Sequence, residues 1–385
     1  MSGAVKLAVT GVQDQWLTGD PEFSYFLTAF KRHTKFSIEQ IETPFDGNID
    51  FGEELQCILP QNKGDLIKGM TVKFILTQPE DGDGNPLNYV PSVCSHLIET
   101  ADLYIGGQLI ERLTGEYIYM HQQLHNTIDD VEQTLYFLNG HGNEVLDFTG
   151  EYTFFIDLPF YFNRNPSLAI PTIALGKQLV EVRIKLRSLD EMINGGVPEL
   201  GVVASMKNAS LDTEFAFVTP EEQSYLRSMP LEYVITQLQV SQAIFTEGQT
   251  EKSFMVNFKN PVREFYILAT NENATTPNEY EKITKLKLDF NDTNIIDADY
   301  NFLNYQQALV KHVNSPTAIS NFATYSFAED PEVYYPTGQV NMSRIFHKLM
   351  TIGIETDKPG PTTVKIYAVS YNVLHIESGL AGLKF

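Results

Sequence analysis

The strongest constraint on the fold is a strict two-residue period in several segments. Within Lys177–Arg187, apolar and charged residues alternate from Val180 onward, and only Leu179 departs from the pattern. Successive side chains of a β-strand point to opposite faces, so this pattern predicts a strand with one buried and one charged face. Met70–Thr77 and Lys285–Phe290 show largely the same alternation. The chain is therefore expected to be built from half-buried antiparallel strands.

Turn residues separate these segments. Gly106 and Gly107 lie in the middle of Leu103–Ile110 and can adopt the positive φ values of a two-residue hairpin turn. A further strand is predicted from the alternating apolar residues Phe254, Val256 and Phe258. Pro261 is expected to limit pairing at the end of that strand, because proline has no backbone N–H.

Helical signals are few and short. Thr219 precedes Pro220 and two glutamates, which is typical of an N-cap followed by the first turn of a helix, here expected to run to about Ser228. Gly115–Asn126 is a second candidate helix, inserted between strands. Many short strands on both sides of a mid-chain helix predict two antiparallel sandwiches joined by a linker.

Length supports two domains. A chain of 385 residues exceeds the size at which a single core normally stops growing. Each half, at about 190 residues, has room for an eight-stranded sandwich with long loops. The halves do not repeat at the residue level, and composition alone does not separate a jelly roll from an immunoglobulin-like topology.

Composition and charge limit the class of protein. No stretch approaches the roughly 20 apolar residues of a membrane span, and the first residues lack the apolar region of a signal peptide. Cys57 and Cys94 match no metal spacing and are expected to be buried free thiols, made in a reducing cytoplasm. The net charge of −22 argues against direct, specific nucleic-acid binding. The exception is a local basic cluster formed by Lys31, Arg32, His33 and Lys35.

The sequence contains no complete catalytic or metal-binding motif. Asp81–Pro86 resembles the start of a calcium loop but lacks its later ligands, so a tight acidic turn is predicted. His121 and His125 would share one helix face, yet Gln122 excludes the zinc-protease motif and no third ligand is placed nearby in sequence. His96 and His141 have no evident partner. We therefore expect no catalytic residue, no metal site and no cofactor.

Four blocks of sequence carry a family resemblance. In chain order they are Gly11–Phe36, Leu158–Pro171, Tyr325–Ile345 and Tyr371–Phe385. In this order and at these distances the chain resembles the double jelly-roll major capsid proteins of nucleocytoplasmic large DNA viruses. It departs from the family pattern in two loops, at Glu329-Asp330 and at Asn291–Asn294.

The resemblance implies an all-β fold of two consecutive antiparallel jelly-roll sandwiches with short inserted helices. We expect an N-terminal arm over residues 1–24, a first jelly roll over 25–215 and a second over 216–385. The chain also lacks the long insertions that form towers on larger relatives, so a relatively flat outer surface is expected.

The same resemblance implies a structural role in the virion. Similar proteins form homotrimers with a pseudo-hexagonal outline that tile an icosahedral shell around membrane and genome. The expected partners are neighbouring capsomers, minor capsid and penton proteins, and proteins associated with an inner membrane; synthesis and assembly are expected in the host cytoplasm. The candidate interface or anchor residues are Lys31, Arg32, His33, Lys35, Arg164 and Arg344.

Two rival functions stay open at this point. With 49 acidic residues, a glycosidase-like pair of carboxylates is compatible with the sequence, so a carbohydrate-binding or glycoside-cleaving sandwich is the alternative. A minor structural protein such as a penton usually needs one sandwich, whereas this chain is long enough for two.

Overall fold

A computed structural model describes residues 3–28, 30–142, 144–163, 165–196, 201–274, 276–316 and 321–385. By their internal contacts these residues form two compact units, residues 1–36 and residues 37–385. The first unit contains two short helices, α1 (Gly3–Ala8) and α2 (Val12–Thr18). The carboxylate of Asp14, in the first turn of α2, accepts a hydrogen bond from the backbone N–H of Gly11 at 2.7 Å, which caps this helix.

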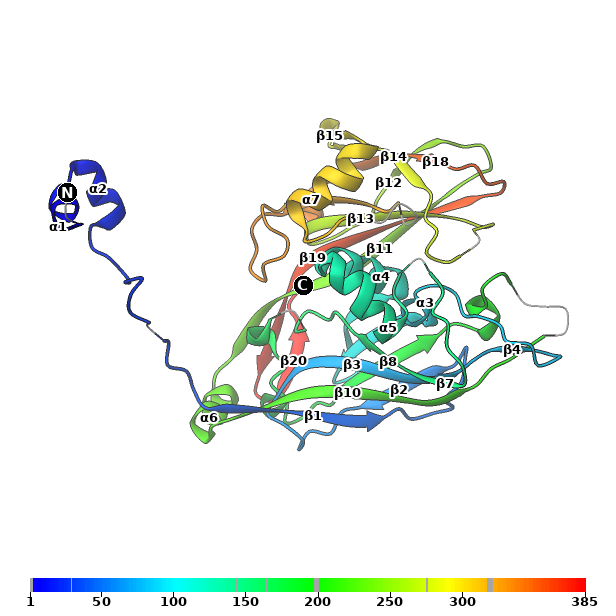
Figure 1. Ribbon diagram of the computed structural model, residues 1–385, viewed down its shortest axis with the longest axis horizontal. Coiled ribbons are helices and arrows are strands. Elements are labelled where there is room, and N and C mark those ends of the chain that lie inside the picture. Colours follow the sequence, from blue (N-terminus) through cyan, green and yellow to red (C-terminus); the bar gives the residue numbers. More distant parts are fainter. Residues whose placement is uncertain are drawn as a thin grey trace. The chain divides into compact units, whose positions relative to one another are not determined.

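The first half of the larger unit contains two four-stranded sheets (Figure 1). One sheet has the order β1-β10-β3-β7, with strands Phe36–Pro44, Met206–Val218, Leu66–Thr77 and Glu151–Asp157. The other has the order β2-β8-β5-β6, with strands Glu54–Ile58, Val180–Leu186, Ile98–Ile105 and Gln108–Thr114. A small pair, β4 (Glu80–Asp81) and β9 (Val202–Val203), lies outside both.

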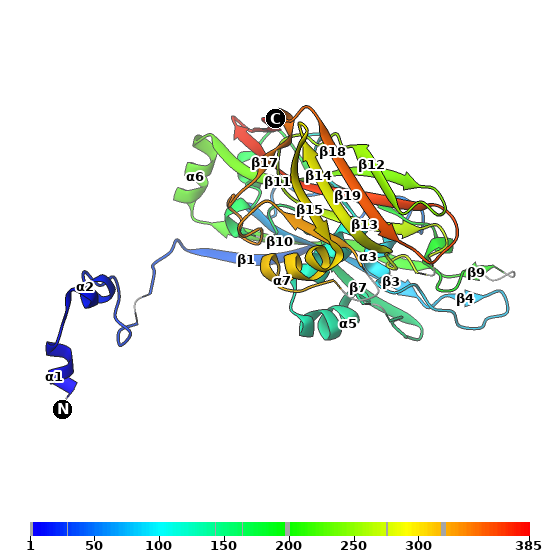
Figure 2. The same cartoon turned by 90° about the horizontal axis from the view of Figure 1, so that it is seen from above.

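The second half repeats this topology. One sheet has the order β11-β19-β13-β16, with strands Leu231–Phe245, Thr362–Glu377, Pro261–Asn271 and Ala323–Ser326. The other, which Figure 2 shows from above, has the order β12-β18-β14-β15, with strands Glu251–Met255, Lys348–Glu355, Lys282–Phe290 and Thr293–Asp299. Two short strands extend the first sheet, β17 (Val340–Asn341) on β13 and β20 (Leu380–Leu383) on β19.

The strand order identifies both halves as jelly rolls. With β4, β9, β17 and β20 left out, each half has eight strands; counted in chain order, one sheet takes the first, eighth, third and sixth, and the other the second, seventh, fourth and fifth. The predicted fold class, two consecutive antiparallel jelly rolls with short helices, is confirmed. The residue boundaries of the arm and the two domains stay a prediction.

Short helices fill the connections. The larger unit contains α3 (Val93–Leu97), α4 (Gly115–His125), α5 (Leu135–Asn139), α6 (Pro220–Ser228) and α7 (Gln307–Lys311). Single helical turns occur at Asp130–Thr134, Pro166–Leu168, Thr172–Ala174, Leu189–Met192, Phe302–Gln306 and Met342–Arg344. Both helices predicted from sequence, α4 and α6, are present. Among the described residues, no helix combines the length and the apolar character needed to cross a membrane.

Most local predictions hold, and one needs correction. The apolar residues of β8 are buried, and Gly106 and Gly107 form the predicted hairpin with φ values of 59° and 80°. However, β12 ends at Met255, so Val256 and Phe258 are buried outside the strand. Pro261 does not end that strand. It is the first residue of β13, a position where a missing N–H costs no internal ladder bond.

Strands β13 and β19, in the middle of the sheet β11-β19-β13-β16, are largely buried on both faces. On β13, Phe265 and Ile267 enter the core of the second jelly roll, whereas Tyr266 and Leu268 enter the core that the first jelly roll supplies. Strand β19 divides in the same way, with Ile366 on one side and Tyr367 on the other. In Figure 1 this sheet lies between the first jelly roll and the outer sheet of the second. The two jelly rolls therefore share apolar packing.

Candidate functional site

The predicted basic cluster precedes β1. Lys31, Arg32, His33 and Lys35 are all exposed, and His33 Nδ1 bonds only its neighbour's carbonyl, Thr34 O, at 2.7 Å. Among the described residues of the first compact unit, none of the four makes an ion pair with an acidic residue of that unit. Their role as anchors stays a prediction.

The structure describes only one of the two other predicted anchors. Arg164 lies outside the described residues. Arg344 ends the helical turn Met342–Arg344, is exposed, and lines a hollow of about 440 Å³ together with Val234, Tyr371 and the C-terminal Phe385. The basic cluster and Arg344 come from different compact units, and their use as anchors stays a prediction.

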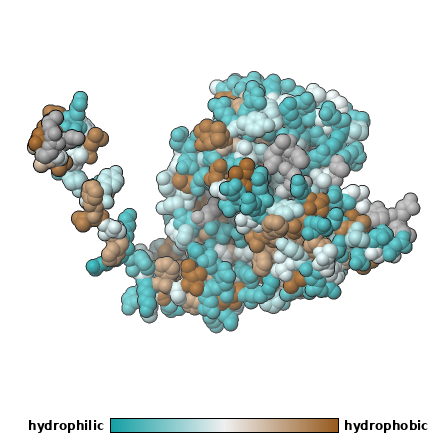
Figure 3. Space-filling view, viewed as in Figure 1, coloured by the Kyte–Doolittle hydropathy of each residue, from teal (hydrophilic) through white to brown (hydrophobic). Residues whose placement is uncertain are grey.

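Large apolar side chains are exposed on the first compact unit. Figure 3 shows apolar residues along its helices and the following segment. The exposed fraction is 89% for Trp16, 90% for Tyr25 and 95% for Phe26. Exposed apolar surface of this kind is typical of a segment that binds to another surface.

A buried charge network joins α4 to the second jelly roll. The carboxylate of Glu116 accepts hydrogen bonds from Arg187 Nη2 at 2.9 Å and from Lys365 Nζ, on β19, at 2.8 Å. Burial by itself would raise the pKa of Glu116, but the charges of Lys365 and Arg187 outweigh this and lower the pKa to about 2. The carboxylate is therefore ionised, and it holds the two jelly rolls together through two cations.

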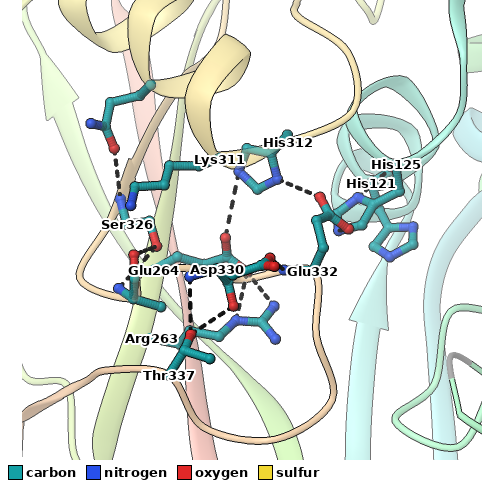
Figure 4. A network of polar contacts seen from close by, with 12 residues as sticks. His121, His125, Arg263, Glu264, Lys311, His312, Ser326, Asp330, Glu332 and Thr337 are labelled. Carbon is teal, nitrogen blue, oxygen red and sulfur yellow. Dashed lines mark hydrogen bonds and ion pairs between the residues drawn. The ribbon is translucent and has the colours of Figure 1, made fainter. Parts of the chain in front are cut away.

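A second network contains a buried arginine and glutamate at the start of β13 (Figure 4). Arg263 donates to Glu264 Oε1 through both Nε, at 2.9 Å, and Nη2. A register irregularity between Val262 and Glu264 turns these adjacent side chains toward each other. Burial disfavours the charge of Arg263, but the Glu264 carboxylate outweighs it and raises the pKa of the guanidinium above its ordinary value.

This second network continues into a histidine cluster between the jelly rolls. His312, just after α7, lies with Nε2 at 3.6 Å from Glu264 Oε2 and with Nδ1 at 2.8 Å from Glu332 Oε1. The other oxygen of Glu332 lies 3.3 Å from Nε2 of His125, the last residue of α4. Figure 4 shows Glu332 between these two imidazoles. The carboxylate thus connects a helix of the first jelly roll to a helix of the second.

The structure adds a histidine cluster that the sequence does not mark. His121 and His125 do share a helix face, with their rings stacked at 3.8 Å between centroids. No third ligand lies nearby in sequence, but the fold brings residues distant in the chain to His125: the ligand atoms of His125, His312 and Glu332 all lie within 4.8 Å of one another. Sequence reasoning missed this cluster because the two new members lie far along the chain and no local spacing marks them.

The other two histidines are also partnered, contrary to expectation. His96 Nδ1 bonds Ser92 O at 3.0 Å, and His141 Nε2 lies 3.3 Å from Gln123 Oε1. Burial lowers the pKa of His96 to about 4 and that of His141 to about 3. Both imidazoles are therefore neutral at pH 7 and act as polar parts of the core.

Two smaller predictions hold. Cys57 and Cys94 are free and buried, and burial raises the pKa of the Cys57 thiol to about 12. Asp81 forms a tight turn by accepting the backbone N–H groups of Asp83 at 2.9 Å and Asn85 at 2.8 Å. The turn is thus closed by its own acidic side chain.

Comparison with known proteins covers the whole chain. Residues 24–210 match the family described as the major capsid protein N-terminus, and residues 222–382 match the large eukaryotic DNA virus major capsid protein family. The major capsid protein of Pyramimonas orientalis virus is 30% identical, over 100% of this chain and 99% of that protein. The major capsid protein of Paramecium bursaria Chlorella virus 1 is 26% identical, over 100% and 99% respectively.

Solved structures agree on the fold. A quasi-atomic description of the PBCV-1 virus capsid superposes with a TM-score of 0.78 at 24% identity, covering 94% of this chain and 100% of that one. The Faustovirus major capsid protein gives a TM-score of 0.71 at 13% identity, covering 96% and 94%. Neither a carbohydrate-binding nor a glycoside-cleaving function is supported. The chain belongs to the major capsid proteins of large eukaryotic DNA viruses and is a structural component of the virion.

Proposed function

We propose that this capsid protein assembles as a homotrimer whose six jelly rolls give a pseudo-hexagonal capsomer, and that these capsomers tile an icosahedral shell. The observation that carries the proposal is the repeated strand order of the two halves. Two similar sandwiches per chain, arranged around a threefold axis, supply the near-sixfold edges that a flat lattice needs.

Within this capsomer we propose an arm over residues 1–24, a first jelly roll over 25–215 and a second over 216–385. The exposed aromatic residues before β1 bury themselves against a neighbouring subunit, a minor capsid or penton protein, or a protein associated with an inner membrane. The basic cluster Lys31, Arg32, His33 and Lys35 binds an acidic surface of that partner. Arg344 and Arg164 are proposed as further anchors.

We also propose that the protein is purely structural, binds no nucleic acid specifically, and is synthesised and assembled in the host cytoplasm. Turnover of a glycan or ester that a single Asp or Glu substitution abolishes would overturn the structural part of this proposal. Binding of viral DNA with sequence preference would overturn the second part.

Light scattering on the purified protein across a dilution series tests the trimer. The expected mass is about three times the 43.5 kDa of one chain, unchanged on dilution, because obligate interfaces are large and apolar. A monomer at every concentration would contradict the proposal. A triple variant, K31E/R32E/K35E, separates the levels of assembly: it is expected to keep the trimer mass but to weaken binding of partner proteins.

A further inference from the structure

We propose that His125, His312 and Glu332 form a binding site for one divalent transition metal ion, with Zn²⁺ as the best fit, and that this ion clasps the two jelly rolls together. The three residues come from distant parts of the chain: the end of α4, the residue after α7, and the loop after β16. α4 lies between β6 and β7 of the first jelly roll, and α7 lies between β15 and β16 of the second. The site therefore joins corresponding connections of the two halves.

The distances between ligand atoms suit a small ion. Zinc bound tetrahedrally to nitrogen and oxygen holds its ligand atoms about 3.4 Å apart. His125 Nε2 and Glu332 Oε2 lie 3.3 Å apart, and His312 Nδ1 and Glu332 Oε1 lie 2.8 Å apart. These two distances go to different oxygens of Glu332, and one ligand atom from each residue lies within 4.8 Å of the others, so rotations of the side chains would be enough to complete the geometry.

The rings are oriented for metal binding by groups behind them. His125 Nδ1 lies 2.9 Å from the carbonyl oxygen of His121. Because a carbonyl only accepts, Nδ1 carries the proton and Nε2 presents its lone pair toward Glu332. His312 can present Nδ1 in the same direction, because its Nε2 faces the Glu264 carboxylate at 3.6 Å. A carboxylate behind a ligating imidazole is the usual second contact of a zinc histidine.

That supporting carboxylate is itself held rigidly. Arg263 donates two hydrogen bonds to Glu264 Oε1, and both side chains are buried, with exposed fractions of 3% and 1%. The remaining oxygen, Oε2, is the one that faces His312. The ligand side chains become progressively more open toward solvent, from 1% exposed for His312 to 11% for His125 and 26% for Glu332. An ion can thus enter from the Glu332 side.

The donor set selects the class of metal. Two imidazoles and one carboxylate suit Zn²⁺, Cu²⁺, Ni²⁺ or Fe²⁺, whereas Ca²⁺ and Mg²⁺ prefer sites made of oxygen alone. Three protein ligands leave a fourth position for water. Binding requires Nδ1 of His312 to give up any proton that it shares with Glu332, so binding releases a proton when that nitrogen is protonated.

The competing explanation is a metal-free ion-pair cluster, in which Glu332 accepts hydrogen bonds from both imidazoles. Purified protein is treated with a chelator, dialysed, and titrated with ZnCl₂ and separately with CoCl₂. We expect one Zn²⁺ per chain by elemental analysis, visible absorption bands of coordinated Co²⁺, and a higher thermal midpoint with Zn²⁺ than without. Absence of stoichiometric binding and of the Co²⁺ bands would overturn the proposal in favour of the ion-pair cluster.

Variants locate the ion. Glu332→Gln and His125→Gln alter the more open ligands and should leave the fold intact, whereas His312 is too buried for its loss to be diagnostic alone. Each is expected to weaken Zn²⁺ binding at least tenfold and to abolish the Co²⁺ spectrum. His375→Gln is the matched control, since His375 also lies beside two glutamates, Glu232 and Glu377, at 3.5 and 3.3 Å. Binding that survives the first two variants, or is lost in the control, would contradict the assignment.

The site is independent of the trimer. All its residues belong to one chain, so Zn²⁺ binding and the mass in solution are separate measurements. A protein that binds no metal but forms trimers would refute only the proposed metal site. A metal-binding monomer would refute only the capsomer proposal.

Discussion

At the residue scale, Glu116 is the clearest case of a buried charge that the fold depends on. Its side chain is only 10% exposed and contacts one cation from each jelly roll. Removing one partner of such a network leaves the other charges buried without compensation, which is strongly destabilising. The network therefore stabilises only the arrangement in which both jelly rolls are in place.

We predict that the stabilising effect of Glu116 is lost in acid. Its pKa is about 2 when folded, against 4.5 for the ordinary group, so its contribution is fully present above pH 4.5 and is lost as the pH falls toward 2. At neutral pH the contribution from this shift is roughly 3 kcal/mol. Urea unfolding of wild type and Glu116→Gln should show a gap in the free energy of unfolding that narrows by about half or more between pH 6 and pH 3.

Glu191→Gln is the control for this experiment. Glu191 also faces Arg187, at 3.6 Å, but its side chain is 56% exposed, so its loss should change stability little at any pH. A gap for Glu116→Gln that stays constant with pH would show that the carboxylate is not held ionised by its partners.

At the element scale, helix α4 begins where the chain has no room for a side chain. A Cβ on Gly115 would lie 2.1 Å from Ser95 O and 2.2 Å from Ile98 O, both of them backbone atoms that cannot rotate away. α4 therefore packs against α3 and the start of β5 at a distance that only glycine permits. The position of His125 at the other end of α4 depends on this contact.

We predict that Gly115→Ala destabilises the protein by about 1–3 kcal/mol or more, because the added methyl group forces the backbone of α4 or α3 to shift. Gly176→Ala is the matched control, since its Cβ would meet nothing within 4 Å, and it should change the free energy of unfolding by less than about 0.5 kcal/mol. Thermal and urea unfolding measure both. Equal effects of the two substitutions would show that a side chain at position 115 does not collide with the backbone of Ser95 and Ile98.

Elements with one buried face could be predicted from sequence, whereas elements with two could not. The alternation in β8 and the glycine pair of the β5–β6 hairpin depend on local patterns, and the structure confirms them. In β13, every residue from Val262 to Ala269 is buried, so no alternation marks which side chain enters which core. The histidine cluster escaped prediction for a related reason, since its members meet only when the two jelly rolls pack together.

At the scale of the whole molecule, the net charge of −22 is the property that most affects how capsomers meet. Trimers that meet edge to edge in a lattice would each carry about three times this charge and should repel one another at low ionic strength. The Debye length is about 10 Å at 0.1 M salt, so added salt screens contacts between capsomers more than the apolar packing within one. Assembly of the shell should therefore respond to salt differently from formation of the trimer.

We predict that association of trimers into larger assemblies strengthens with moderate salt or with calcium, while the trimer mass stays constant. Light scattering on isolated trimers across a salt series measures both quantities. The opposite result, association that weakens steadily as salt is added, would mean that lattice edges pair acidic with basic groups.

The burial of β13 and β19 on both faces also explains why the halves share a strand order but no residue-level repeat. Two copies of one topology normally tolerate similar substitutions, but in the second copy the central strands β13 and β19 pack against a core on each face. A polar replacement is acceptable on the outer face of β8, whereas in β13 a buried polar side chain needs a partner, as Arg263 has in Glu264. Because different substitutions are tolerated in the two halves, their sequences diverge while the strand order is kept.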